Sequence, residues 1–82
     1  MNATEILNIQ EEIIREIFDN NDIKVSRETT ADDVDEWDSL THIQLVAAIE
    51  KKFGIRFALA ELQSLKDVGE MTDLIAKKLG VY

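Results

Sequence analysis

The chain has 82 residues, 9 basic and 17 acidic side chains, a formal net charge of −8 at pH 7, and neither cysteine nor proline. This length fits a single domain over residues 1–82. The missing cysteines exclude disulfides and thiolate metal ligands, and one histidine argues against a zinc centre, so we expect no metal site. Residues 1–40 carry 12 of the acids and 3 of the bases. This charge excludes nucleic acid as a natural partner and favours a basic protein partner, unless it serves solubility alone.

The chain also lacks the sequence signals of membrane insertion and secretion. No apolar run approaches the roughly 20 residues that a membrane helix needs. The N-terminus has neither the basic region nor the apolar region of a secretion signal. We therefore expect a cytoplasmic monomer without stable membrane insertion, and the absence of cysteine suits a reducing compartment.

Apolar residues recur at intervals near 3.6, which predicts an all-α fold. The first helix is predicted from Ala3 to Asp19, with Asn2 or Thr4 as its cap. Its repeating apolar positions are Ile6, Ile9, Ile13 and Ile17. A polar connection then runs from Asn20 to Asp38, longer than most links between helices, which indicates a functional or well-packed loop. The apolar residues expected to fold this loop onto the core are Ile23, Val25, Val34 and Trp37.

The second helix has the clearest predicted boundaries, from Ser39 to Phe53. Asp38 is a suitable N-cap, Lys51 and Lys52 complement the dipole in the last turn, and Gly54 fits a left-handed residue after the helix. A short helical turn is predicted over residues 58–63. The last helix is predicted over residues 68–78, after an Asp67–Glu70 pair that resembles a capping box. Its expected inward residues are Val68, Met71, Leu74 and Ile75.

A helical wheel separates two apolar faces on the second helix. The predicted core face consists of Leu45, Val46, Ile49 and Phe53. Leu40, Ile43 and Ala47 fall on a different face, beside Ser39. An apolar face that the core does not need predicts a docking surface, and the alternative is that it packs under the long loop.

Ser39 is the candidate reactive residue. A serine at a helix start is usually a cap, but Asp38 is better placed for that role and leaves the Ser39 hydroxyl free. A phosphate on this hydroxyl would meet unpaired N–H groups and the positive end of the helix dipole. Asp38 would oppose the phosphate by charge repulsion, but it could orient the hydroxyl or hold a metal ion during an attachment reaction.

These residues resemble the attachment motif of the acyl carrier protein family. The motif is Asp38-Ser39-Leu40 at the start of a helix in which Leu45, Ile49 and Phe53 occupy family-like positions. Residues 67–71 are similar to the start of the family's last helix, so the resemblance covers nearly the whole chain. It implies a four-helix bundle with three longer helices, one short helix and a long loop between the first two.

The resemblance also implies a mechanism. A phosphopantetheinyl transferase, with Mg²⁺ and coenzyme A, would attach 4′-phosphopantetheine to Ser39, and Asp38 and Leu40 on either side would be further cofactor-binding residues. The thiol of this arm would carry acyl groups as thioesters, which explains how a chain without cysteine serves thioester chemistry. The chain would be a carrier and not an enzyme, and acyl-loading and acyl-processing enzymes would act on its cargo. The residues expected to contact these partners are Asp35, Glu36, Trp37, Ile43 and Ala47.

Departures from the family pattern favour a dedicated pathway over bulk fatty acid synthesis. Thr41 and Gln44 stand where acids are common, and Lys51-Lys52 replaces an acidic pair. A polyketide, modified-lipid or surface-polysaccharide pathway fits this weaker electrostatic steering better. Two alternatives stay open. One is an aminoacyl or peptidyl carrier, although Glu36-Trp37-Asp38 replaces the usual Gly-Gly-His/Asp before the serine, and the other is a non-covalent helical adaptor.

Three other features have simpler interpretations. We interpret His42 as a packing residue near the core, because the sequence shows no partner for it, or else as part of the arm's exit. Trp37 is interpreted as an apolar lid over the start of the second helix, with contact to the arm as the alternative. The acidic run 19–22 lacks the glycine and the bidentate glutamate of an EF-hand, so that reading is rejected.

Overall fold

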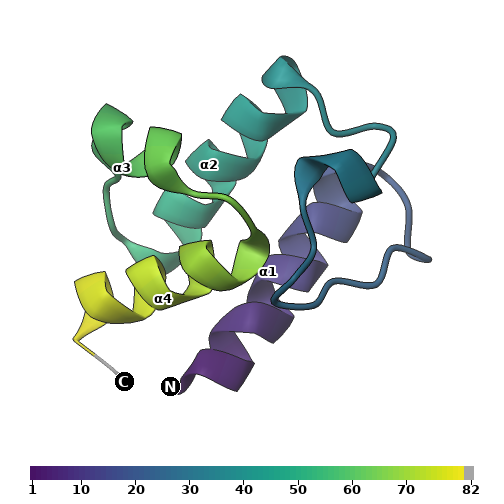
Figure 1. The fold of residues 1–82 in the computed structure, drawn as a ribbon. Helices are drawn as coiled ribbons and strands as arrows, with labels where there is room; N and C mark the ends of the chain where they lie inside the picture. Colours follow the sequence, from purple (N-terminus) through teal and green to yellow (C-terminus); the bar gives the residue numbers. More distant parts are fainter. Residues whose placement is uncertain (81–82) are drawn as a thin grey trace.

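The computed structural model describes residues 1–80. This part of the chain consists of helices joined by irregular segments and contains no strand. Its elements in chain order are α1 (Ala3–Ile17), the short 3-10 turn η1 (Ala31–Asp33), α2 (Ser39–Phe53), α3 (Leu59–Ser64) and α4 (Val68–Leu79) (Figure 1). The predicted all-α fold, with three longer helices, one short helix and a long first loop, is confirmed.

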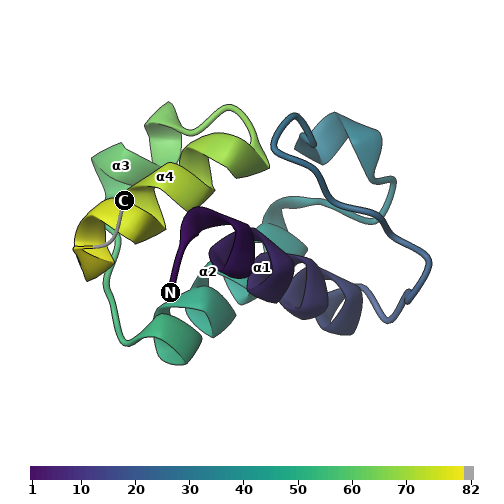
Figure 2. The same ribbon diagram turned by 90° about the horizontal axis from the view of Figure 1, so that it is seen from below.

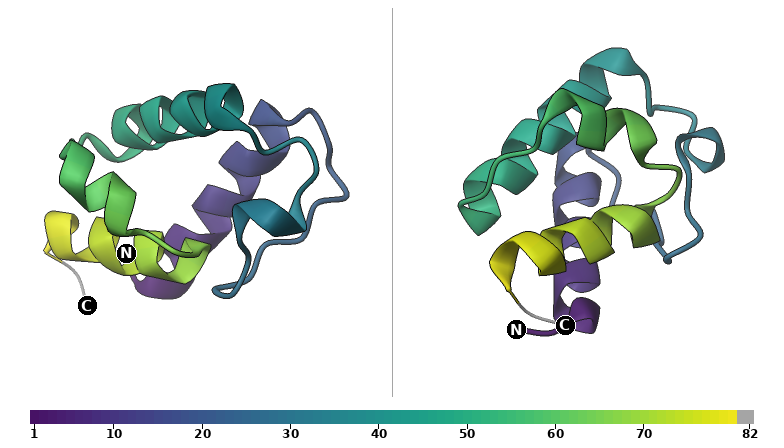
Figure 3. Two further views of the ribbon diagram at one scale, coloured as in Figure 1. Left: turned by 45° about the horizontal axis from the view of Figure 1, so that its top comes forward. Right: turned by 60° about the vertical axis from the view of Figure 1, so that its left-hand side comes forward.

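α1 packs against both α2 and α4 and lies between them (Figure 2). α3 bridges the end of α2 and the start of α4, and the loop that carries η1 lies beside the start of α4, away from α3 (Figures 1 and 3). No helix within residues 1–80 is long and apolar enough to cross a membrane.

The core is built from one face of each long helix, with Val34 added from the long loop. Its buried apolar residues are Ile6, Ile13, Ile14, Phe18, Val34, Leu45, Val46, Ile49, Val68, Met71, Ile75 and Ala76. The predicted core face of α2 is therefore confirmed, with Phe53 partly buried against the cluster. On α4 the expectation for Leu74 was wrong, because this side chain remains partly exposed while Ala76, two positions on, is buried.

Most helix boundaries agree with the sequence, and the exceptions have local causes. Asn2 caps α1 by accepting a hydrogen bond from the Glu5 N–H. α1 ends at Ile17 and not at Asp19, because Asp19 adopts a left-handed φ of 50° and the chain turns back on the helix. α3 is shifted by one residue, since the Glu61 carboxylate accepts from the Ala58 N–H and fixes Ala58 as the cap position.

The long loop is fastened to the first turn of α4. The Val68 N–H donates to the Thr29 carbonyl at 2.9 Å, and the Gly69 N–H donates to the Arg27 carbonyl at 2.8 Å. The Arg27 guanidinium also donates two hydrogen bonds to the Asp73 carboxylate. A Cβ on Gly69 would lie 2.8 Å from the Arg27 carbonyl oxygen, so this close approach requires glycine. The loop thereby satisfies N–H groups that a helix start normally leaves unpaired.

Candidate functional site

The start of α2 is held by a reciprocal cap. The Asp38 carboxylate accepts from the Thr41 N–H at 2.9 Å, and the Thr41 hydroxyl accepts from the Asp38 N–H at 2.8 Å. The predicted N-cap is confirmed, and Thr41 supplies the second half of a capping box that the sequence analysis did not anticipate. Ser39 is exposed and lies outside these capping bonds, so its hydroxyl projects from the first turn of the helix.

The electrostatic setting at Ser39 combines a helix start with a carboxylate. The hydrogen bond from the Thr41 N–H lowers the pKa of Asp38, helped by the Thr41 hydroxyl and the Leu40 N–H. Asp38 therefore stays ionised through the physiological range beside Ser39. The positive end of the α2 dipole offsets part of this charge for any phosphate carried by the hydroxyl.

The second apolar face of α2 is open to solvent, as expected. Leu40 is 64% exposed and Ile43 is 66% exposed, and Ala47 is exposed one turn further along. The alternative, that these residues pack under the long loop, is contradicted by their exposure. Asp35 and Glu36 are also exposed, in the segment that leads into the helix. Apolar and acidic groups thus flank Ser39 on the surface.

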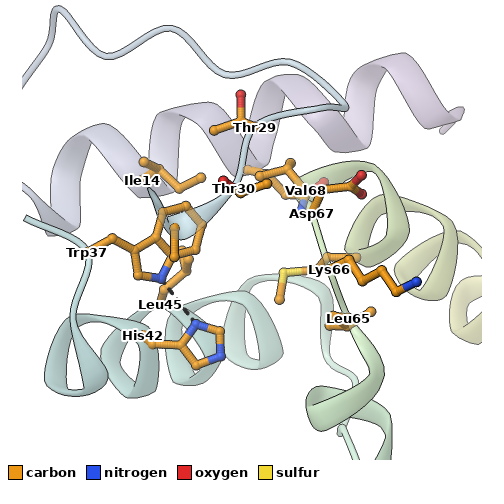
Figure 4. A pocket seen from close by; sticks show the side chains of 13 residues that line it. Ile14, Thr29, Thr30, Trp37, His42, Leu45, Leu65, Lys66, Asp67 and Val68 are labelled. Atoms are coloured by element: carbon orange, nitrogen blue, oxygen red, sulfur yellow. Dashed lines mark hydrogen bonds between the residues drawn. The ribbon is translucent and has the colours of Figure 1, made fainter. Parts of the chain in front are cut away.

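Trp37 lies over the start of α2 and packs inward. Its ring lies 5.6 Å from the Phe18 ring between centroids, and its Nε1 donates to the Nδ1 of His42 at 3.1 Å (Figure 4). The interpretation of Trp37 as a lid is confirmed. His42 packs as expected, but it has the hydrogen-bond partner that the sequence did not reveal.

Ser39 borders an open groove that shares a wall with a second, partly enclosed cavity. Ala31, Trp37 and His42 line both spaces, and the groove also contacts Asp38 and Ile43. The cavity has a volume of about 90 Å³ and lies between α1, the loop, the start of α2 and the start of α4. Figure 4 shows Trp37 and His42 along one side of it, and Thr29, Thr30 and Val68 along another.

Gln10 is a site residue that the sequence analysis missed. It is fully buried, lines the cavity, and accepts a hydrogen bond from the Thr72 hydroxyl through Oε1. A signal was available in the sequence, because Gln10 sits four residues from both Ile6 and Ile14 on the inward face of α1. A polar residue on an apolar stripe is an unusual choice that a wheel can detect.

Comparisons with known proteins agree with this geometry. Residues 5–75 match the family model described as a phosphopantetheine attachment site. The chain is 38% identical over 78 residues to the acyl carrier protein of Acidothermus cellulolyticus, covering 93% of this chain and 90% of that one. Its fold is similar to the solution structure of a holo acyl carrier protein from Geobacter metallireducens, with a TM-score of 0.86, 47% identity, and coverage of 90% of this chain and 85% of the other.

Proposed function

Because this chain belongs to the acyl carrier protein family, we propose that its phosphopantetheine arm is attached to the hydroxyl oxygen of Ser39. In the attachment reaction a transferase would break the pyrophosphate linkage of coenzyme A. The Ser39 oxygen would lose its proton and bond to the phosphorus of 4′-phosphopantetheine, and adenosine 3′,5′-bisphosphate would leave with that proton. The arm supplies a terminal thiol, on which acyl groups are held as thioesters. The chain's own contribution is to present and orient this serine.

One observation carries the assignment to Ser39. The Asp38–Thr41 capping box pairs N–H groups at the start of α2 without using the Ser39 side chain. Ser39 remains exposed beside an open groove. A capping serine would be engaged with the backbone and would lose a hydrogen bond when modified. Ser39 avoids this conflict, so a bulky phosphodiester can be added without unpairing the helix start.

We propose that partner enzymes read the surface around Ser39. Leu40, Ile43 and Ala47 offer an exposed apolar strip, and Asp35 and Glu36 offer negative charge close to it. A basic partner would be steered by the acids and then bury the apolar strip. Trp37 contributes through its outer edge and by holding the loop in place, since its ring is packed against Phe18.

The pathway is proposed from the departures on α2. Gln44, Lys51 and Lys52 are all exposed, so the loss of negative charge relative to the common pattern lies on the surface that a partner meets. This supports a dedicated lipid, polyketide or polysaccharide-linked pathway. We further propose a single carrier domain over residues 1–82, acting in the cytoplasm as a monomer and without catalytic activity of its own.

The test is loading by a promiscuous phosphopantetheinyl transferase with coenzyme A and Mg²⁺. Intact-protein mass spectrometry should show the gain of one phosphopantetheinyl group, and Ser39→Ala should show none. Ser64→Ala, which changes an exposed serine at the end of α3, is the matched control and should load normally. An unmodified wild-type chain with several transferases would overturn the proposal in favour of a non-covalent adaptor.

The loaded chain also separates acyl from aminoacyl cargo. Acyl ligases should charge the arm of the wild-type protein, and amino-acid adenylating enzymes should not. Charging by adenylating enzymes alone would instead identify a peptidyl carrier.

A further inference from the structure

The two ends of α2 carry opposite charges. Asp35 and Glu36 are exposed in the segment that enters the helix, and Lys51 and Arg56 are exposed where the chain leaves it (Figure 1). A helix rises by 1.5 Å per residue, so Ser39 and Lys51 lie about 18 Å apart along the axis. This separation exceeds the screening length of about 8–10 Å at physiological salt, so each end is a separate electrostatic feature.

The cations at the far end of α2 form no ion pair within residues 1–80. The carboxylates in this part of the chain that pair with a basic side chain within 4.0 Å do so with other cations. Glu50 lies beside Lys51 and Arg56, but its carboxylate accepts from the Phe57 N–H at 2.9 Å and holds the turn that follows the helix. Lys51 and Arg56 are therefore available to a carboxylate on another molecule.

Lys51 continues the exposed apolar strip of Leu40, Ile43 and Ala47. On a wheel of 100° per residue, Leu40, Ala47 and Lys51 fall within an arc of about 40°. The structure agrees with this arc, because Ala47 and Lys51 line one open groove together with Arg56. A partner that covers the strip from Leu40 to Ala47 therefore meets these cations at its far end.

Helix stability accounts for only part of this positive charge. Cations in the last turn offset the helix dipole, and α4 has the same arrangement with Lys77 and Lys78. Arg56, however, lies beyond Phe53, the last residue of α2, and still lines the groove with Lys51. The groove thus gathers more positive charge than the end of the helix requires.

We propose that the enzyme that loads the acyl group presents carboxylates to Lys51 and Arg56, in addition to basic side chains that meet the acids near Ser39. The inference rests on the proposed function, since it names the chemistry of a partner that acts on an arm at Ser39. If α2 docked in the reverse direction, like charges would face each other at both ends of the helix, which weakens binding. The charge pattern thus selects the direction that places Ser39 beside the partner's basic side chains.

The test uses the full chain with its arm, and the acyl ligase that charges the wild-type protein with the highest kcat/KM. Lys51→Glu/Arg56→Glu should lower this kcat/KM about tenfold, chiefly by raising KM, because carboxylates would then face carboxylates. Lys66→Glu/Lys77→Glu, at two exposed lysines outside α2, changes the net charge equally and should leave kcat/KM within about twofold of wild type. Added salt should shrink the difference between the two double variants.

The sign of the effect decides between two kinds of partner. A ligase with a uniformly basic docking surface would favour Lys51→Glu/Arg56→Glu, so an unchanged or raised kcat/KM would overturn the inference. An equal loss in Lys66→Glu/Lys77→Glu would also overturn it, because net charge alone would then explain the effect. If glutamate in the last turn unfolds α2, Lys51→Gln/Arg56→Gln keeps the helix propensity and should still lose about threefold, and no loss would overturn the inference.

These outcomes are distinguishable from failure of the proposed function. An unchanged or raised kcat/KM in Lys51→Glu/Arg56→Glu, with Ser39 still taking up the arm by mass spectrometry, would remove the carboxylates and leave the carrier function intact. Failure of Ser39 to take up the arm would overturn both.

Discussion

The Nε1 of Trp37 donates to the Nδ1 of His42 across 3.1 Å, with the two rings stacked and their centroids 6.2 Å apart. This bond requires an unprotonated Nδ1, so His42 holds its ring proton on Nε2. It also joins the end of the long loop to α2 immediately beside Ser39. Trp37 from the loop and His42 from α2 therefore form one hydrogen-bonded, stacked unit of the site.

Replacing His42 with alanine should loosen the lid. Trp37 is the only tryptophan in the chain, so tryptophan fluorescence reports the surroundings of this one indole. We expect the emission of His42→Ala to shift to longer wavelength, because the indole loses its stacked neighbour and gains water. Lys52→Ala, at an exposed position near the other end of α2, should leave the spectrum unchanged. An unshifted spectrum in His42→Ala would show that His42 does not hold the indole.

The charge of Asp38 should stabilise the fold only above its titration range. The pKa of Asp38 is lowered in the folded state from the ordinary 3.8, chiefly by the Thr41 N–H. A lowered pKa means that the stabilisation is present above the unfolded value and is lost as pH falls through the folded value. Thermal unfolding of Asp38→Asn should therefore show a deficit near pH 7 that disappears in acid.

Asparagine keeps a neutral cap at this position, so the comparison isolates the charge. Asp35→Asn, outside the cap, controls for the general relief of repulsion in an acidic protein. A deficit in Asp38→Asn that is constant from pH 7 to below pH 3 would contradict the assignment.

The Gln10–Thr72 pair should show strong coupling. The single hydroxyl proton of Thr72 is shared between the Gln10 Oε1 and the Val68 carbonyl, and both Gln10 and Thr72 are fully buried. Thr72→Val should lower the free energy of unfolding by about 1–3 kcal/mol, because it leaves the whole amide unpartnered. Gln10→Met should be nearly neutral, since Thr72 keeps its bond to Val68. In denaturant unfolding, the cost of Thr72→Val should shrink in the Gln10→Met background, and strict additivity would refute the coupling.

Gly69→Ala should destabilise the protein even though alanine has a higher helix propensity than glycine. Alanine is favoured over glycine in a helix by about 1 kcal/mol. At Gly69, however, the new Cβ would lie 2.8 Å from the backbone oxygen of Arg27, which cannot move aside cheaply. Overpacking typically costs about 1–3 kcal/mol, so we expect a net loss of stability in urea unfolding. Lys77→Ala, on an exposed position of the same helix, should change little, and a stabilised Gly69→Ala would contradict the close approach.

Changing Ile43 should affect partners and not the fold. Its side chain is 66% exposed on α2, and Leu59 on α3 is 72% exposed, which makes Leu59 a matched control. Ile43→Asp should reduce the transferase kcat/KM by at least about tenfold, a loss of roughly 1.4 kcal/mol of binding. The Tm should stay nearly constant in both variants. Equal kinetics for Ile43→Asp and Leu59→Asp would show that the α2 face is not the docking surface.

Local signals made much of this structure predictable from the sequence. Asp38 and Gly54 mark the ends of α2 by capping chemistry that acts within a few residues, and the two faces of α2 follow from its period. The end of α1 was misjudged because Asp19 takes a left-handed conformation more typical of glycine. The Thr72 bond to Gln10 joins residues that no local pattern relates, so only the packed fold reveals it.

The loop carbonyls of Arg27 and Thr29 accept hydrogen bonds from the N–H groups of Gly69 and Val68, respectively. Both donors are synthesised long after the loop. A growing chain therefore cannot fasten the loop until α4 has emerged. The entropy lost in closing so large a loop is a cost that arises only at that stage. The loop that lines the groove at Ser39 through Ala31 and Trp37 is fastened only when α4 docks. A nascent polypeptide that still lacks α4 would display the serine-bearing helix beside an unfastened loop, which ties maturation of the carrier to the synthesis of α4.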